Sequence, residues 1–333
     1  MKFFITGING QLGHDINLEL LERGYTDIYA PSSKEVDITN KEAVENAIIN
    51  YKPDIIFHCA AYTAVDKAED DKDKCYNVNV IGTKNITECA KRINARLIYI
   101  STDYVFDGTK DGYYIEDDKT NPINYYGETK YLGEEEVRKY DNHIITRISW
   151  VFGINGKNFV KSMLNLAETR DSLNIVADQV GSPTYTKDLS KLLVDIAGSD
   201  KRGTYHVTND GYCSWYEFAK YIFESNDVHI NVNPITTEEY PTRANRPHNS
   251  KMSKEKLIND GFVMLPSWQD AVDRYNKELK KIAKEITILE QKCQNGENIS
   301  ENLVLMEELV SKLSIEDLLE LSLLIETNFP WRL

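Results

Sequence analysis

The chain has 333 residues, of which 28% are charged and 41% hydrophobic, and its formal net charge is −14. This length and composition allow one large α/β unit or two domains with substantial cores. The negative charge argues against nucleic acid or an anionic membrane as the main partner, but a small anion can still bind at a local site.

The sequence carries no sign of export or membrane insertion. The apolar run that follows Met1 is too short for a signal peptide, and no stretch reaches the roughly 18 apolar residues that a spanning helix needs. The five cysteines form no Cys-x-x-Cys pair. We therefore expect a cytoplasmic protein with free thiols.

Short apolar runs alternate with amphipathic helical patterns through residues 1–150. The runs cover residues 2–6, 27–30, 54–60, 96–101 and 143–148, and the helical patterns lie near 11–23, 40–51, 75–94 and 125–140. Runs that are apolar on both faces and alternate with helices predict an α/β fold with a Rossmann-type, doubly wound parallel sheet. We expect residues 1–150, with contributions from about 174–207, to form this domain.

Residues 151–279 show a less regular pattern. Helices are predicted at 157–169, 186–198 and 214–225, a short strand at 204–208, and proline-containing loops at 234–247 and 266. These elements suggest a smaller, C-terminal substrate domain draped over the carboxyl edge of the sheet.

The character of the chain changes again near residue 277. Helices are predicted at 276–293, 302–313 and 314–326, with a turn at 294–301. An apolar surface is expected from the leucines at 303, 309, 313, 318, 319, 323 and 324. We expect residues 280–333 to form an added α-helical tail that packs on the body, on a second copy in a homo-oligomer, or on a partner protein.

Residues 6–13, TGINGQLG, join the first strand to the first helix. Glycines at this junction permit a tight turn and let backbone N–H groups approach a pyrophosphate, which the helix dipole also attracts. The turn therefore predicts a dinucleotide-binding site. Its expected contacts are Gly7, Asn9, Gly10, Gln11, Leu12 and Gly13.

The end of the second run bears on the choice of cofactor. A carboxylate there would bind the ribose hydroxyls and favour NAD, but Ala30 and Pro31 occupy the position. A 2′-phosphate could instead be held by Ser32, Ser33 and Lys34, so the sequence favours NADPH, with NADH also compatible. The alternative for these three residues is a polar surface loop. The adenine would be bordered by Asp37 and Ile38.

Two Tyr-x-x-x-Lys pairs occur in the chain, Tyr126 with Lys130 and Tyr216 with Lys220. Only the first pair follows a strand end with a hydroxyl, Thr102, at the edge where doubly wound sheets bind ligands. Reduction of a carbonyl leaves an alkoxide that needs a proton, and a phenol near an ammonium can donate it. We expect the second pair to be structural.

Several segments together resemble the extended short-chain dehydrogenase/reductases and, within them, the group of dTDP-4-dehydrorhamnose reductases. The resemblance extends from residue 1 to about 279. It rests on the glycine turn and on CAAYTAVDKAE (59–69), STDYVFDG (101–108), NYYGETKYLGE (124–134), RISWVFG (147–153), DQVGSPTY (178–185) and RPHNS (246–250).

This resemblance implies a site in which Thr102, Tyr126 and Lys130 carry out the reduction and Asp103 supports them. Tyr126 and Lys130 also contact the cofactor, whose remaining contacts would be Ala60, Ala61 and Tyr62. The nucleotide-sugar would be bound by Thr63, Val65, Thr102, Asp103, Trp150, Asn158 and Arg246. From the residues alone, the alternatives are that Trp150 is a core residue and that Arg246 is a surface ion-pair partner.

Two features depart from that group. Cys59 stands where relatives usually have asparagine, and the tail after residue 279 lies outside the pattern. Some relatives dimerise around magnesium held by acidic side chains, two of which Asp15 and Glu278 match. Lys187 stands where a third acid is expected, so no metal site is predicted.

The expected activity is NAD(P)H-dependent reduction of the 4-keto group of dTDP-4-dehydro-β-L-rhamnose. One alternative is reduction of another 4-keto-6-deoxy nucleotide-sugar. A second is the role of a related family, the regulatory subunit of methionine adenosyltransferase, which binds NADP and a partner enzyme without turning over a sugar.

Overall fold

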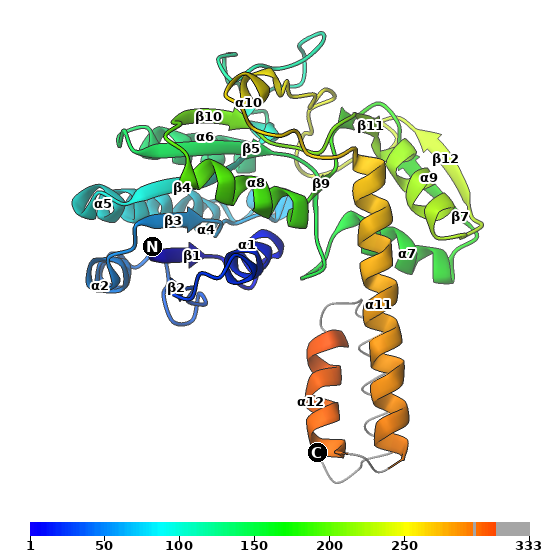
Figure 1. The fold of residues 1–333 in the computed structure, drawn as a ribbon. Coiled ribbons are helices and arrows are strands. Elements are labelled where there is room, and N and C mark those ends of the chain that lie inside the picture. The colour runs from blue at the N-terminus through cyan, green and yellow to red at the C-terminus, as the bar shows by residue number, and fades with distance from the viewer. Residues whose placement is uncertain (296–297, 311–333) are drawn as a thin grey trace.

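The structure, a computed structural model, describes residues 1–295 and 298–310. Within these residues, six parallel strands form one sheet in the order β10-β5-β4-β3-β1-β2 (Figure 1). The strands are β1 (Phe3–Thr6), β2 (Ile28–Tyr29), β3 (Ile55–His58), β4 (Arg96–Thr102), β5 (His143–Ile148) and β10 (Gly203–His206). The strand order switches direction at β1, which predicts a ligand site at the carboxyl ends of β1 and β3.

Helices cover both faces of this sheet. Successive side chains of a strand point to opposite faces, so Phe3 and Ile5 pack on one side and Phe4 on the other. The first side is covered by α1 (Gln11–Glu22) and α8 (Thr186–Gly198), and the second by α2 (Lys41–Tyr51), α5 (Thr83–Ile93) and α6 (Tyr125–Val137). The predicted doubly wound α/β sheet is confirmed.

The helix predicted at 75–94 is divided into three parts. After the short α3 (Val65–Ala68), the chain forms α4 (Lys72–Tyr76), a π-helix (Asn77–Gly82) and then α5. A π-turn carries one extra residue and redirects the side chains within it. Here it turns Asn79 toward the loop after β3, where its amide bonds both the N–H and the C=O of Tyr62.

Smaller elements gather beside the carboxyl edge of the sheet (Figure 1). They comprise three strand pairs and two helices. The pairs are β6 (Val151–Phe152) with β9 (Thr184–Tyr185), β7 (Ser172–Val176) with β12 (Asn231–Ile235), and β8 (Val180–Gly181) with β11 (Cys213–Ser214), and the helices are α7 (Phe159–Thr169) and α9 (Trp215–Ser225). Helix α10 (Glu255–Asn259) lies instead next to the edge strand β10 (Figure 1). The pairing of β7 with β12 was not predicted, because the two strands are short and half-exposed and their partners lie far apart in the sequence.

The last helices begin earlier than predicted. Helix α11 (Trp268–Gln294) starts where the Ser267 side chain accepts the N–H of Asp270, well before residue 277. Its apolar stripe runs through Trp268, Ala271, Val272 and Tyr275, the i, i+3, i+4, i+7 spacing of a core-facing helix. The first tail helix therefore continues a helix that is anchored in the body.

Beyond the body, α11 projects outward and α12 (Ile299–Val310) runs alongside it (Figure 1). Their contact buries apolar side chains that include Ile286 and Leu289 from α11 and Leu303, Met306 and Leu309 from α12. Leu303 and Leu309, two of the leucines that were expected to form an apolar surface, are buried in this contact. The helix predicted at 314–326, with the leucines at 313, 318, 319, 323 and 324, lies outside the described residues.

In the described part of the chain, none of the helices combines the length and the apolar character that crossing a membrane would require.

Candidate active site

A cavity of about 770 Å³ opens at the carboxyl edge of the sheet and begins at the glycine turn. Gly7 has a φ of +74°, and a Cβ on Gly13 would lie 2.3 Å from the Gly7 carbonyl oxygen, so neither position tolerates a side chain without displacement. Helix α1 then starts with no side-chain cap and no acidic residue in its first turn. Its free N–H groups and dipole therefore suit a phosphate group.

The cavity continues to the loop after β2. Its lining there consists of Pro31, Ser32, Ser33, Val36, Asp37 and Ile38. The backbone N–H and hydroxyl of Ser32 both donate to the Glu35 carboxylate at 2.8 Å. A 2′-phosphate bound by Ser32 would displace this carboxylate. Lys34 is exposed and lies outside the lining, so its contact with a 2′-phosphate stays a prediction.

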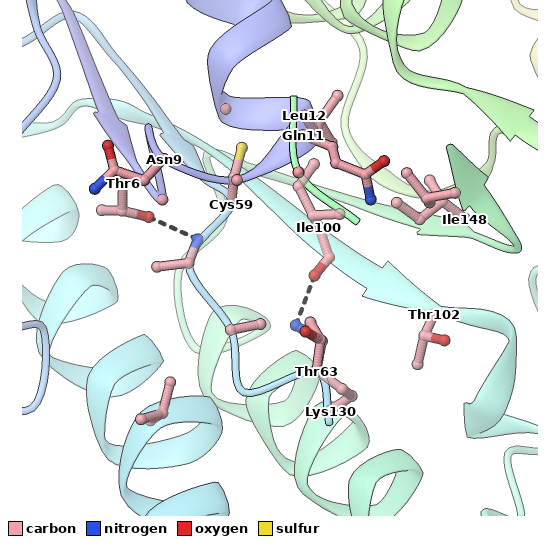
Figure 2. A pocket seen from close by; sticks show the side chains of 18 of the residues that line it. Thr6, Asn9, Gln11, Leu12, Cys59, Thr63, Ile100, Thr102, Lys130 and Ile148 are labelled. Carbon is pink, nitrogen blue, oxygen red and sulfur yellow. Dashed lines mark hydrogen bonds between the residues drawn. The ribbon is translucent and has the colours of Figure 1, made fainter. Parts of the chain in front are cut away.

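The loop after β3 forms the floor of the cavity through Ala60 and Ala61. The Ala60 N–H donates to the Thr6 hydroxyl at 3.0 Å, which ties the ends of β1 and β3 together (Figure 2). Cys59 also lines the cavity, and burial raises the pKa of its thiol to about 12, so the thiol is neutral. Tyr62 lies outside the lining, with its hydroxyl directed to Asp71.

A buried histidine supports this floor. His58 lies between the hydroxyls of Thr6 (2.8 Å to Nδ1) and Thr83 (3.0 Å to Nε2), and burial lowers its pKa to about 3. The Thr83 hydroxyl donates to the Asn79 carbonyl at 2.7 Å and therefore accepts from Nε2–H. His58 is thus a neutral link between the glycine turn and the π-helix.

Three predicted catalytic residues lie together in the cavity wall. Tyr126 and Lys130 are one turn apart on α6, and Thr102 ends β4. Figure 2 shows Lys130 pointing from α6 to the carbonyl oxygen of Ile100 on β4, which its Nζ reaches at 2.7 Å. The Thr102 hydroxyl donates to Asp103 Oδ1 at 3.0 Å and interacts with the Tyr126 phenol, which lowers the phenol pKa.

Burial controls the ionisation of this group. It raises the pKa of Tyr126 well above that of an ordinary phenol, so the hydroxyl carries its proton at neutral pH. It lowers the pKa of Lys130 to about 7, against an upward effect of the Glu134 carboxylate. It raises the pKa of Asp103 to about 6, although hydrogen bonds from Ser250 and Thr102 oppose the shift.

Close packing fixes α6 against the sheet. Asn124 caps the helix by accepting the N–H of Gly127, and a Cβ on Gly127 would lie 2.2 Å from the Tyr104 carbonyl oxygen. The absence of a side chain at Gly127 therefore permits this close contact between helix and loop. One turn after Lys130, Glu134 is buried and binds Arg147 on β5 through two hydrogen bonds of 2.8 and 2.9 Å.

The wall opposite the sheet carries aromatic side chains. Trp150, with a φ of +47°, stacks on Trp215 at 3.6 Å between ring centroids, and Phe159 lies 4.6 Å from Trp215. All three line the cavity, together with Thr63 and Val65. The predicted placement of Trp150, Thr63 and Val65 at a ligand-facing wall agrees with this geometry.

Two predicted substrate residues take other positions. Asn158 caps α7, and its amide donates to Gly153, Gln11 and Tyr275, so it holds the loop and does not line the cavity. Arg246 also lies outside the lining and forms an ion pair with Asp66 at 2.7 Å. Its contact with a substrate diphosphate stays a prediction.

Sequence reasoning missed part of the lining, including Ser149, Asn155, Lys157, Phe159 and Trp215. In the sequence, Phe159 and Trp215 look like core residues of helices. Their spacing from neighbouring apolar residues is the same whether a helix packs on the core or lines a ligand site. The only available signal was GINGK at 153–157, a glycine-rich turn shortly before a helix.

The second tyrosine–lysine pair has a different setting. Tyr216 and Lys220 lie on α9 outside the cavity, Lys220 is exposed, and its ammonium stands 5.7 Å from the Tyr216 ring. The helix packs through Phe218, Ile222 and Phe223 instead. This geometry fits a structural role.

The two acidic residues that match magnesium ligands of relatives, Asp15 and Glu278, interact with other side chains of the protein. The Lys187 ammonium lies 3.0 Å from both carboxylate oxygens of Glu278, which also accepts from the Tyr185 hydroxyl at 2.6 Å. Asp15 accepts from the Thr186 hydroxyl. Among residues 1–295 and 298–310, no group of three or more His, Cys, Asp or Glu side chains is arranged for metal binding. These residues do not fit a divalent cation.

Comparison with known proteins gives consistent matches. The model of the family "RmlD substrate binding domain" matches residues 1–281. The dTDP-4-dehydrorhamnose reductase of Aggregatibacter actinomycetemcomitans is 43% identical over 81% of this chain and 97% of its own. The spore coat polysaccharide biosynthesis protein SpsK of Bacillus subtilis is 41% identical over 83% of this chain and 97% of its own.

A solved structure agrees with these matches. The dTDP-4-dehydrorhamnose reductase of Bacillus anthracis, in complex with NADP, superposes with a TM-score of 0.81 at 43% identity, covering 84% of this chain and 100% of that chain. The sheet, the glycine turn and the tyrosine–lysine helix described above lie within the matched range. The chain belongs to the RmlD substrate binding domain family.

Proposed function

We propose that this protein reduces the 4-keto group of dTDP-4-dehydro-β-L-rhamnose with NADPH and forms dTDP-L-rhamnose. The observation that carries the proposal is the convergence of Thr102, Tyr126 and Lys130 in the cavity that begins at the glycine turn. The relatives named for this reaction, one of them solved with NADP, support the choice of substrate and cofactor. The activity serves the synthesis of surface polysaccharide, as the name of SpsK indicates for that relative.

The residues around the cavity fit the cofactor. The uncapped start of α1 suits its pyrophosphate, Ser32 and Ser33 face the place of a 2′-phosphate, and Ala60 and Ala61 form a flat floor. NADPH, when bound, supplies the hydride. NADH is a second donor, because none of the described residues that line the cavity depends on the 2′-phosphate.

The proton comes from the protein. Tyr126 donates its phenolic proton to the substrate oxygen, and Thr102 donates a hydrogen bond to the same oxygen. Lys130, when protonated, stabilises the phenolate that remains and binds the nicotinamide ribose. In the structure the single proton of the Thr102 hydroxyl is donated to Asp103 Oδ1, so the hydroxyl turns from Asp103 to the substrate oxygen when the substrate binds.

The nucleotide-sugar lies against the aromatic wall. Trp150, Thr63 and Val65 bound its place, and Arg246 contacts its diphosphate after leaving Asp66. In this division of the chain, residues 1–150 with part of 174–207 bind the cofactor and residues 151–279 bind the substrate. We place the protein in the cytoplasm, where the free thiols of the five cysteines stay reduced.

The helices α11 and α12 beyond residue 279 serve association between chains. The part of α11 after residue 281 and the whole of α12 lie outside the family match. Neither part lines the cavity, and together they expose Ile288, Val304 and Leu305. Apolar side chains exposed on a projecting pair of helices favour a contact with a second copy or with a partner protein.

One assay tests the proposed reaction. NADPH oxidation is followed with freshly prepared dTDP-4-dehydrorhamnose, and the product is identified by chromatography against dTDP-L-rhamnose. Turnover of this substrate in preference to other 4-keto-6-deoxy nucleotide-sugars is the expected result. Cofactor binding without any turnover would point instead to a regulatory subunit.

A further inference from the structure

One cation in the cavity has no assigned role. Two cationic side chains, Lys130 and Lys157, occur among the residues that line the cavity in the described part of the chain. Lys130 is buried and hydrogen-bonded to the Ile100 carbonyl. Lys157 is exposed, and no ion-pair or hydrogen-bond partner contacts it within residues 1–295 and 298–310. An unpaired ammonium on the wall of an anion-binding cavity is available to a ligand.

The residues around Lys157 are fastened to the glycine turn. The Asn155 amide donates to the carbonyl oxygens of Asn9 at 3.1 Å and Gly10 at 3.3 Å. On the other side, the Asn158 amide donates to Gln11 Oε1 at 3.1 Å. A Cβ on Gly156, which has a φ of +85°, would lie 3.7 Å from Gln11 Cγ. The loop therefore lies over the first residue of α1, and Lys157 extends from it.

The charge of the surroundings favours an anion at this point. The first turn of α1 contains no acidic residue, and its N–H groups are uncapped. The acidic residues of the lining are Asp37, beyond the adenosine loop, and Asp103, beside Thr102. A lysine ammonium acts on phosphate as a flexible point charge and needs no fixed geometry.

We propose that Lys157 binds the pyrophosphate of the cofactor from the loop that is fastened to the glycine turn and lies over the start of α1. The loop that carries it belongs to the segment leading into α7, so the same contact joins the cofactor to the substrate side of the cavity. The inference rests on the proposed NADPH-dependent reduction. Lys157 thus binds a different group from the other polar residues of the site. Ser32 and Ser33 are assigned to the 2′-phosphate, and Arg246 is assigned to the substrate diphosphate.

Binding measurements test this assignment without turnover. Dissociation constants for NADPH, NADH and dTDP are measured by titration calorimetry for the wild type, Lys157→Met and Lys157→Arg. The matched control is Lys277→Met, which removes the same charge from an exposed position on α11 outside the cavity. For Lys157→Met we expect affinity to fall about tenfold for NADPH and equally for NADH, the loss typical of one charge-assisted hydrogen bond.

The other expected results follow from the pyrophosphate being common to both cofactors. Lys157→Arg restores most of the affinity, dTDP binding is unchanged, and Lys277→Met behaves as the wild type. A loss confined to NADPH would place Lys157 at the 2′-phosphate, and a loss confined to dTDP would place it on the substrate; either result overturns the proposal, as does unchanged cofactor affinity. Failure of the wild type to bind either cofactor would overturn the proposed function as well.

Discussion

At the scale of single residues, the proposed chemistry depends on the phenol of Tyr126, whose environment differs from that of Tyr216. Tyr126 has Thr102 beside its hydroxyl and Lys130 one turn along α6. Tyr216 has the same spacing to Lys220 but faces no cavity. The two pairs therefore allow a controlled comparison within one chain.

We predict that Tyr126→Phe lowers kcat by about 10²–10⁴-fold, because the proton donor is lost while the ring remains. The affinity for NADPH should barely change. Steady-state kinetics and a cofactor titration measure the two quantities. Tyr216→Phe is the control and should keep the wild-type rate; a comparable loss there would mean that the wrong pair has been assigned.

The pH dependence of the reaction should report Lys130. Its pKa is lowered to about 7, so the fraction that is protonated falls as pH rises through this value. The Tyr126 phenol keeps its proton over the same range. Because the protonated lysine is the active form, log kcat/KM for reduction should decline with a slope of −1 above about pH 7.

Lys130→Arg provides the matched test, since a guanidinium stays protonated throughout this range. Whatever its absolute rate, its kcat/KM should be flat where the wild type declines. The assignment to Lys130 fails if the arginine variant shows the same decline at the same pH, because another group, such as Asp103, would then control the profile.

At the scale of elements, catalysis depends on how closely α6 approaches β4 and the loop that follows it. The glycine at 127 permits this approach, and the buried pair of Glu134 with Arg147 fixes the helix one turn beyond Lys130. The Ser101 hydroxyl, next to Thr102, donates to the same carboxylate at 2.5 Å. Helix and strand thus share one buried set of hydrogen bonds that sets the distance between Tyr126 and Thr102.

We predict that Gly127→Ala lowers the free energy of unfolding by about 1–3 kcal/mol, because the added methyl group would meet the Tyr104 carbonyl at 2.2 Å. The displaced helix should also lower kcat. Denaturant unfolding and kinetics measure both effects.

The control is Gly198→Ala, at the end of α8, where an added Cβ meets nothing within 4 Å. This substitution should raise the free energy of unfolding by about 0.4–1 kcal/mol through a stiffer unfolded chain. Equal stability of the two variants would contradict the steric account of Gly127.

At the scale of the whole molecule, α11 connects two functions. Its first half packs in the body through Trp268 and Tyr275, and its second half supports α12 outside the body. None of the described residues after 279 lines the cavity. Association and catalysis should therefore be separable by a cut within this helix.

We predict that a chain ending at residue 279 keeps NADPH affinity and kcat/KM within about twofold of the full chain, because the removed part is distant from the cavity. Its association state or its solubility should change. Light scattering coupled to size exclusion measures the molar mass. The full chain with Val304→Asp and Leu305→Asp should reproduce the change without truncation; unaltered mass and solubility would refute the role of the tail in association.

Much of the fold and part of the site could be predicted because their signals lie close together in the chain. The strands β1, β3, β4 and β5 appeared as apolar runs, and helices α1, α2, α6 and α8 as periodic patterns with the observed bounds to within a few residues. The glycine turn and the pair Tyr126 and Lys130 were read from local spacing. Asn158 was predicted to bind the substrate; its amide caps α7 and bonds the Gly153 carbonyl, so the substrate contact stays a prediction.

By itself, the sequence determined the doubly wound sheet and the cofactor turn and located the pair Tyr126 and Lys130, whose catalytic role we propose, because each is encoded by neighbours within one or two turns or strands. Only the tertiary structure decided that Asn79 bonds the loop at Tyr62, that Trp215 stacks on Trp150, and that Arg246 pairs with Asp66. It also decided that the loop carrying Lys157 is bonded to the glycine turn and the start of α1. Each of these joins segments that are distant in the chain, and their contact depends on packing and hydrogen bonding, which no local periodicity records.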